Sequence, residues 1–106
     1  MNQQNSNYET HLVELWLNND EDLYFAVRTM ARSFYDSCSS SQYLSRDEEA
    51  TSQLAEWLAT LVEAQCEIES PTLASDLLSN AIRSVNFHEI ARDIIVDISE
   101  EFAHTE

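Results

Sequence analysis

The chain of 106 residues contains no glycine. Phosphate-binding loops, dinucleotide-binding turns and nucleophile elbows need glycine where the backbone approaches a ligand closely or adopts a positive φ. The composition therefore excludes nucleotide-binding and hydrolase motifs of these kinds.

Potential metal ligands and nucleophiles are also sparse. Cys38 and Cys66 are the only cysteines and form no Cys-x-x-Cys motif, and the three histidines are scattered, so no structural zinc set is present. His88 opens a stretch like a zinc-protease helix, but Arg92 stands where that motif needs its second histidine. We expect no enzymatic activity, no bound metal and no cofactor.

Long apolar runs are missing as well. No segment approaches the ~20 apolar residues of a membrane span, and residues 1–7 lack the apolar stretch of a signal peptide. We therefore expect a cytoplasmic protein with reduced thiols.

Positive charge is scarce: five basic residues, all arginine, stand against 20 acidic ones, for a formal net charge of −15. Such a charge repels nucleic acid and anionic membranes. We expect no direct binding to either, and a protein partner that is basic.

What the chain does contain is helical periodicity. Apolar residues make up 43% of the chain and recur at helical spacing in five segments. Predicted caps separate the segments: Asn7 or Thr10, Asp20, Ser45 with Glu48, Ser70 before Pro71, and Asn86 with Glu89. We predict a polar arm over residues 1–7 and one all-α domain over 8–106, a compact bundle of about five short helices.

The periodicity also predicts which side chains meet inside the bundle. The expected central layer is Trp57, Leu61, Leu78, Ile82, Ile90 and Ile94. Trp16 and Tyr24 also stand at positions compatible with the core. Four residues have no clear place inside, and they are the candidates for a homodimer contact: Leu17, Tyr35, Tyr43 and Phe102.

The acidic residues form two rows. Glu49, Glu56 and Glu63 recur every seven residues and Glu67 extends them, which places a carboxylate about every 10 Å along one helix face. The second row, in the last helix, consists of Asp93, Asp97, Glu100 and Glu101. A domain of this length is about 35 Å across, and duplex DNA of that length carries roughly 20 phosphate charges, so the net charge is of DNA-like magnitude.

Two stretches resemble a family of short proteins from phages, plasmids and bacterial genomes that begin Asn-Tyr-Glu-Thr-Trp. They are Asn7–Thr10 with Leu15, Trp16 and 18–22, and the closing stretch Ser84–Ala91. This chain departs from the family at His11 and Phe87, where the family has tryptophan. No activity is assigned to that family; the resemblance implies a mobile-element setting, in which small acidic proteins act as anti-restriction or anti-CRISPR inhibitors.

Two functions follow as expectations. In one, the acidic rows bind a basic nucleic-acid-binding site by DNA mimicry. In the other, the chain is a helical interaction or regulatory module with an apolar contact surface, and its charge serves solubility. The affinity of the first should fall steeply with salt, whereas that of the second should barely respond.

Overall fold

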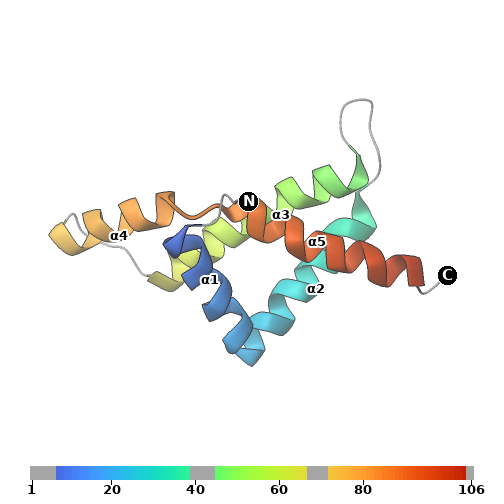
Figure 1. The fold of residues 1–106 in the computed structure, drawn as a ribbon, viewed down its shortest axis with the longest axis horizontal. Helices are drawn as coiled ribbons and strands as arrows, with labels where there is room; N and C mark the ends of the chain where they lie inside the picture. Colours follow the sequence, from blue (N-terminus) through green and yellow to red (C-terminus); the bar gives the residue numbers. More distant parts are fainter. Residues whose placement is uncertain (1–6, 39–44, 67–71, 105–106) are drawn as a thin grey trace.

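The protein folds into five α-helices in a computed structural model that describes residues 7–38, 45–66 and 72–104. The helices are α1 (Tyr8–Asn19), α2 (Glu21–Ser37), α3 (Arg46–Cys66), α4 (Leu73–Arg83) and α5 (Phe87–His104) (Figure 1). No strand occurs in the described ranges, and the predicted all-α bundle of about five helices is confirmed. None of the described helices is both long and apolar enough to cross a bilayer.

Two predicted helix starts, those of α2 and α3, are confirmed by their hydrogen bonds. The Asp20 carboxylate accepts the N–H of Leu23 at 3.0 Å. At the start of α3, the Ser45 hydroxyl accepts the N–H of Glu48 while the Glu48 carboxylate accepts the N–H of Ser45, at 3.1 and 2.9 Å. These short-range bonds satisfy N–H groups that have no partner within the helix.

The start of α4 differs from the prediction. Thr72 is its N-cap and forms a reciprocal capping box with Ser75, with N···O distances of 2.8 and 3.0 Å. The predicted cap at Ser70 and Pro71 lies outside the described residues.

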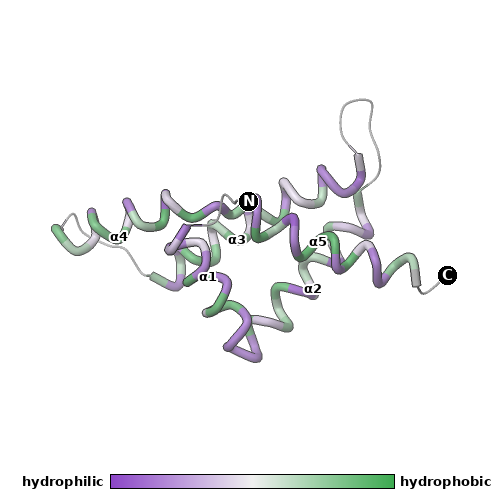
Figure 2. Tube along the Cα trace, in the orientation of Figure 1, coloured by the Kyte–Doolittle hydropathy of each residue, from purple (hydrophilic) through white to green (hydrophobic). Residues whose placement is uncertain are grey.

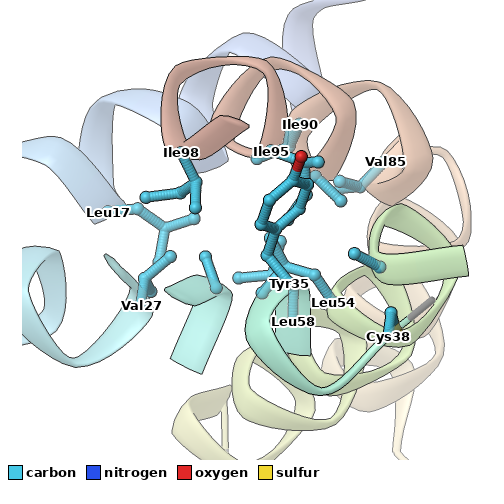
Figure 3. Packing of buried hydrophobic residues seen from close by; sticks show 13 residues of the cluster. Leu17, Val27, Tyr35, Cys38, Leu54, Leu58, Val85, Ile90, Ile95 and Ile98 are labelled. Atoms are coloured by element: carbon cyan, nitrogen blue, oxygen red, sulfur yellow. The ribbon is translucent and has the colours of Figure 1, made fainter. Parts of the chain in front are cut away.

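The core lies where α2, α3 and α5 meet. Leu54 and Leu58 of α3 and Ile95 and Ile98 of α5 are almost completely buried, and Figure 3 shows them converging between the helices. Three alanines are fully buried: Ala31, Ala50 and Ala91. Their small side chains allow the helices to approach closely.

The predicted central layer is therefore wrong in part. Ile82 and Ile90 are buried as expected, but four other members are only partly buried: Trp57, Leu61, Leu78 and Ile94. The helices approach each other at the buried alanines. On α3 and α5, the centre of the core is therefore filled by aliphatic side chains that stand one position away from the predicted residues in the sequence. Leu78 belongs to α4, which lies outside this contact.

The structure places inside three of the four residues for which the sequence indicated no clear position, which leaves little of them for a dimer contact: Leu17, Tyr35 and Phe102. Leu17 and Tyr35 are buried, and Phe102 is partly buried against the core; Tyr43 lies outside the described residues. The rings of Tyr35 and Phe102 meet edge to face at 5.0 Å. The Arg46 guanidinium lies 4.1 Å from the Tyr35 ring centroid and its Nε donates to the Tyr35 carbonyl at 2.8 Å, so a cation covers the apolar pair.

The remaining helix, α4, projects from one end of the bundle (Figure 1). The described chain measures 51 × 32 × 26 Å, longer than the ~35 Å expected for a compact domain of this length. The close helix pairings are those among α1, α2, α3 and α5. Helix α4 is therefore an appendage whose own packing is incomplete.

Candidate functional site

The start of α1 meets the turn between α4 and α5. The Asn7 side chain caps α1 by accepting the N–H of Thr10 at 2.8 Å, and its Nδ2 donates to the Ser84 carbonyl at 2.7 Å. The backbone N–H of Asn86 donates to Thr10 Oγ1 at 2.8 Å. Asn7, the last residue of the predicted polar arm, thus joins α1 to the α4–α5 turn.

This junction gives the two distinctive segments of the sequence a structural role. Asn7 and Thr10 belong to the opening segment, and Ser84 and Asn86 to the closing one. The Asn86 side chain also caps α5 by accepting the N–H of Glu89 at 3.0 Å. The junction fixes α1 beside α4 and so shapes the space between them.

That space is an apolar groove of about 490 Å³, which we call the α1–α3–α4 groove. Its walls are Glu9, Leu12, Val13, Trp16, Val62, Gln65, Cys66, Leu78, Ala81, Ile82 and Val85. Leu12 is 51% exposed and Trp16 38%. Trp16 was expected in the core; because α4 leans away from α1, its ring faces the groove instead.

The apolar surface continues from the groove along α4. Leu73 and Leu77, on the first two turns of this helix, are 77% and 61% exposed, and Figure 2 shows apolar positions recurring along the projecting helix. Large exposed apolar patches on a folded domain mark interaction surfaces.

This apolar surface is also nearly free of charge. Asp76 and Arg83 are the only charged residues of α4, so the helix has a formal net charge of zero in a chain of −15. Among the residues that the structure describes, Glu9 is the only carboxylate that lines the groove. The chain therefore separates its charge from its exposed apolar surface.

The first predicted acidic row lies on the outer side of α3. Glu56 and Glu63 are exposed and Glu49 is half-buried; Glu67 lies outside the described residues. These side chains stand opposite the buried positions 54 and 58, which pack toward α5, so the row points away from α5. Among the described residues, no arginine lies within ion-pair distance of it.

The second predicted row, on α5, is largely paired with arginine. The Arg28 guanidinium lies 2.7 Å from Glu101 and 3.6 Å from Asp97. Arg32 binds the other Glu101 oxygen at 3.1 Å, and Asp93 lies 3.9 Å from Arg92. Glu100 is exposed. The two rows thus face different directions: three of the four carboxylates on α5 have an arginine within ion-pair distance, and those of the α3 row have none in the described ranges.

A second, polar pocket of about 380 Å³ lies between α1, α2 and α5. Glu14, Arg28, Asp93 and Asp97 line it. Burial raises the pKa of Glu14, and the nearby carboxylates of Asp93 and Glu89 raise it further. Its walls include Tyr24, 38% exposed although expected in the core, whose ring lies 5.6 Å from the Arg28 guanidinium.

The residues considered for chemistry are not brought together. In the described ranges, no group of three His, Cys, Asp or Glu side chains has the arrangement of a metal site. Cys38 is buried. Burial raises the pKa of its thiol, and the nearby charge of Glu49 raises it further. Cys66 lies in the groove, and His88 is exposed at the start of α5.

Apolar periodicity does not reveal the groove, because the groove residues belong to helical stripes that resemble core positions. Leu12, Trp16 and Leu78 all fit such stripes. One signal was present in the sequence: of the five predicted helical segments, the one with the apolar stripe from Leu73 to Val85 is the only one whose charges sum to zero.

Comparison of the chain with protein-family models, with curated proteins and with solved structures gave no match.

Proposed function

We propose that this protein binds a basic protein partner through the carboxylates on the outer face of α3 and catalyses no reaction. The observation that carries the proposal is the row of Glu49, Glu56 and Glu63, which points away from the bundle and is without an arginine partner among the described residues. Carboxylates without local counter-ions attract a positively charged surface at long range and orient its approach.

The most specific form of this proposal is DNA mimicry, and its charge can be compared with that of DNA. Duplex DNA as long as the 51 Å axis of the molecule carries roughly 30 phosphate charges. The net charge of −15 is about half of that. A charge of this size supports competition with nucleic acid for a basic binding site in the cytoplasm, as in an anti-restriction or anti-CRISPR inhibitor. The competition would depend on charge spread over a broad surface rather than on one carboxylate at the position of each phosphate.

The test is affinity capture from host lysate at low and high salt, with duplex DNA as a competitor. The proposal expects retained partners that are basic and nucleic-acid-binding. They should be released as ionic strength rises, because screening over about 10 Å or less weakens exposed charge pairs. Partners that are neither basic nor nucleic-acid-binding, and that stay bound at high salt, would refute the proposal.

Matched variants locate the binding surface. The triple substitution Glu49→Gln, Glu56→Gln and Glu63→Gln removes three charges from α3. The control Asp36→Asn, Asp93→Asn and Glu100→Gln removes three charges from α2 and α5. The α3 variant should lose most of the captured partner, whereas the control should keep most of it; equal losses would mean that only net charge matters.

A second candidate function is favoured by the α1–α3–α4 groove: a helical interaction or regulatory module that binds through its apolar surface. Capture of its partner would persist at high salt and would be lost on Leu12→Glu, a change that leaves the α3 row intact.

A further inference from the structure

We propose that the α1–α3–α4 groove and the projecting α4 form the interface of a symmetric homodimer, so that the occupant of the groove is a second copy of this chain. The proposal concerns a surface distinct from the carboxylates of α3. It rests on the exposure, the charge and the complementary shape of α4 and the groove.

The first argument is that α4 needs apolar cover. Helices shorter than about 12–15 residues are marginal in water, and most of their stability in proteins comes from packing an apolar face. Helix α4 has 11 residues; Ile82, near its C-terminal end, is buried, while Leu73 and Leu77 at the other end are mostly exposed. A second copy is the one partner present whenever the chain is present.

The second argument is charge. Two chains of net charge −15 repel each other unless they meet where carboxylates are few. Within the described ranges the surface of α4 and the groove is that place, since α4 has no net charge and Glu9 is the only described carboxylate that lines the groove. A basic amphipathic helix would find little negative charge here, because Glu9 is the only carboxylate among the described residues that line the groove.

The third argument is self-complementarity. Each copy offers a ridge, formed by Leu73 and Leu77, and a groove whose open wall contains Leu12 and Trp16. In an interface with two-fold symmetry, the contact of one surface with another occurs twice. An antiparallel pair of α4 helices would direct the ridge of each copy toward the groove of the other.

The test is the molar mass of the full chain by light scattering and sedimentation equilibrium at micromolar concentration. The wild type should have twice the 12.2 kDa of one chain. The variant Leu73→Glu with Leu77→Glu should have the mass of one chain, and its far-UV helix signal should fall by no more than the share of the 11 residues of α4. The control Phe25→Glu with Val96→Glu adds the same charge at residues that are 58% and 45% exposed elsewhere and should remain a dimer.

Salt distinguishes this interface from the acidic surface. Because screening reduces the repulsion between two acidic chains, the dissociation constant of the dimer should fall with added salt, by severalfold over a tenfold increase in ionic strength. Binding of a basic partner to α3 should weaken over the same range. The dimer proposal can therefore fail while the proposed function stands, and the reverse.

A measurement on the wild type covers the case in which the glutamate variant does not fold. Trp16 lines the groove, so dilution of a dimer should shift its fluorescence to longer wavelength, and Trp16→Phe identifies the signal. Each of four results would overturn the proposal. The first two are a wild type with the mass of one chain at high concentration and high salt, and a Leu73→Glu, Leu77→Glu variant that stays dimeric. The other two are a control that dissociates, and Trp16 emission that does not depend on dilution.

Discussion

The backbone N–H of Asn86 donates a hydrogen bond of 2.8 Å to the hydroxyl of Thr10, 76 residues earlier in the chain. Thr10 is fully buried, although it lies in the first turn of α1. With the bond from Asn7 to Ser84, this contact holds α1 against the turn between α4 and α5. The two walls of the α1–α3–α4 groove are thereby fixed to each other at one end.

Replacing Thr10 by valine should destabilise the protein by about 1–3 kcal/mol, because the N–H of Asn86 loses its acceptor in a partly buried place. Urea unfolding followed by circular dichroism measures the loss. Thr60→Val is the control, since the Thr60 hydroxyl bonds only its own helix, at the Glu56 carbonyl, on the surface. The control should change stability by about 0.5 kcal/mol or less; equal effects would show that the long-range bond contributes nothing.

Hydrogen bonds that cap a helix from within its own segment could be predicted from the sequence, whereas the long-range bond between Thr10 and Asn86 could not. A cap such as Asp20 or Ser45 bonds an N–H three residues away, so residue type and spacing are enough to identify it. The bond between Thr10 and Asn86 depends on how helices pack, which no spacing within one helix encodes.

The same distinction explains the errors about the core and the groove. Apolar periodicity shows which face of a helix is buried, but not whether alanine or leucine occupies the closest helix crossing. It also predicts that α4 has an apolar face without showing that this face extends beyond the bundle. Leu77 and Leu58 fit equally good stripes, yet one is 61% exposed and the other is fully buried.

Leucine-to-alanine substitutions should therefore distinguish positions that are buried in the core from positions that only share the helical spacing of core residues. Leu54→Ala removes a fully buried side chain and should cost about 2–5 kcal/mol, from lost burial and the cavity left behind. Leu15→Ala makes the same chemical change where the side chain is 45% exposed, and should cost less than half as much. Urea midpoints at matched protein concentration measure both, and similar losses would mean that the core is assigned to the wrong face of α3.

The pairing of Glu101 predicts a loss of stability in acid. Its hydrogen bond with Arg28, and next that with Arg32, hold the pKa of Glu101 below its ordinary value. The ionised carboxylate therefore stabilises the folded state above the unfolded-state pKa, and this contribution is lost as pH falls through the lower folded-state pKa. Glu101→Gln should destabilise the protein at neutral pH by up to about 1 kcal/mol, because the Glu101 side chain is 42% exposed and solvent screens its ion pairs.

Stability measured as a function of pH checks this assignment. The difference between wild type and Glu101→Gln should shrink to nothing once the pH lies below the folded-state pKa. The neighbouring Glu100→Gln, at an exposed carboxylate for which no ion pair is found among the described residues, should show no such loss. A Glu101→Gln deficit that persists at low pH would show that the side chain acts by packing instead.

Glu14 should have the opposite effect. Burial, followed by the charges of Asp93 and Glu89, raises the pKa of Glu14. The unfolded chain then ionises this carboxyl at lower pH than the folded protein does. Ionisation therefore costs stability as pH rises from the unfolded-state pKa to the folded-state pKa, and the full cost remains at higher pH. Glu14→Gln removes this cost and should raise the urea midpoint at neutral pH.

The control is Glu56→Gln, which removes the same charge from the exposed face of α3 and so measures the effect of net charge alone. At neutral pH, Glu14→Gln should have a higher urea midpoint than Glu56→Gln. In acid below the unfolded-state pKa of Glu14, this carboxyl is protonated in both the folded and the unfolded wild type, and the advantage of Glu14→Gln should vanish. Equal midpoints for the two variants at neutral pH would mean that the polar pocket does not specifically destabilise the folded protein when Glu14 is ionised. Only the net charge of the chain would then affect its stability.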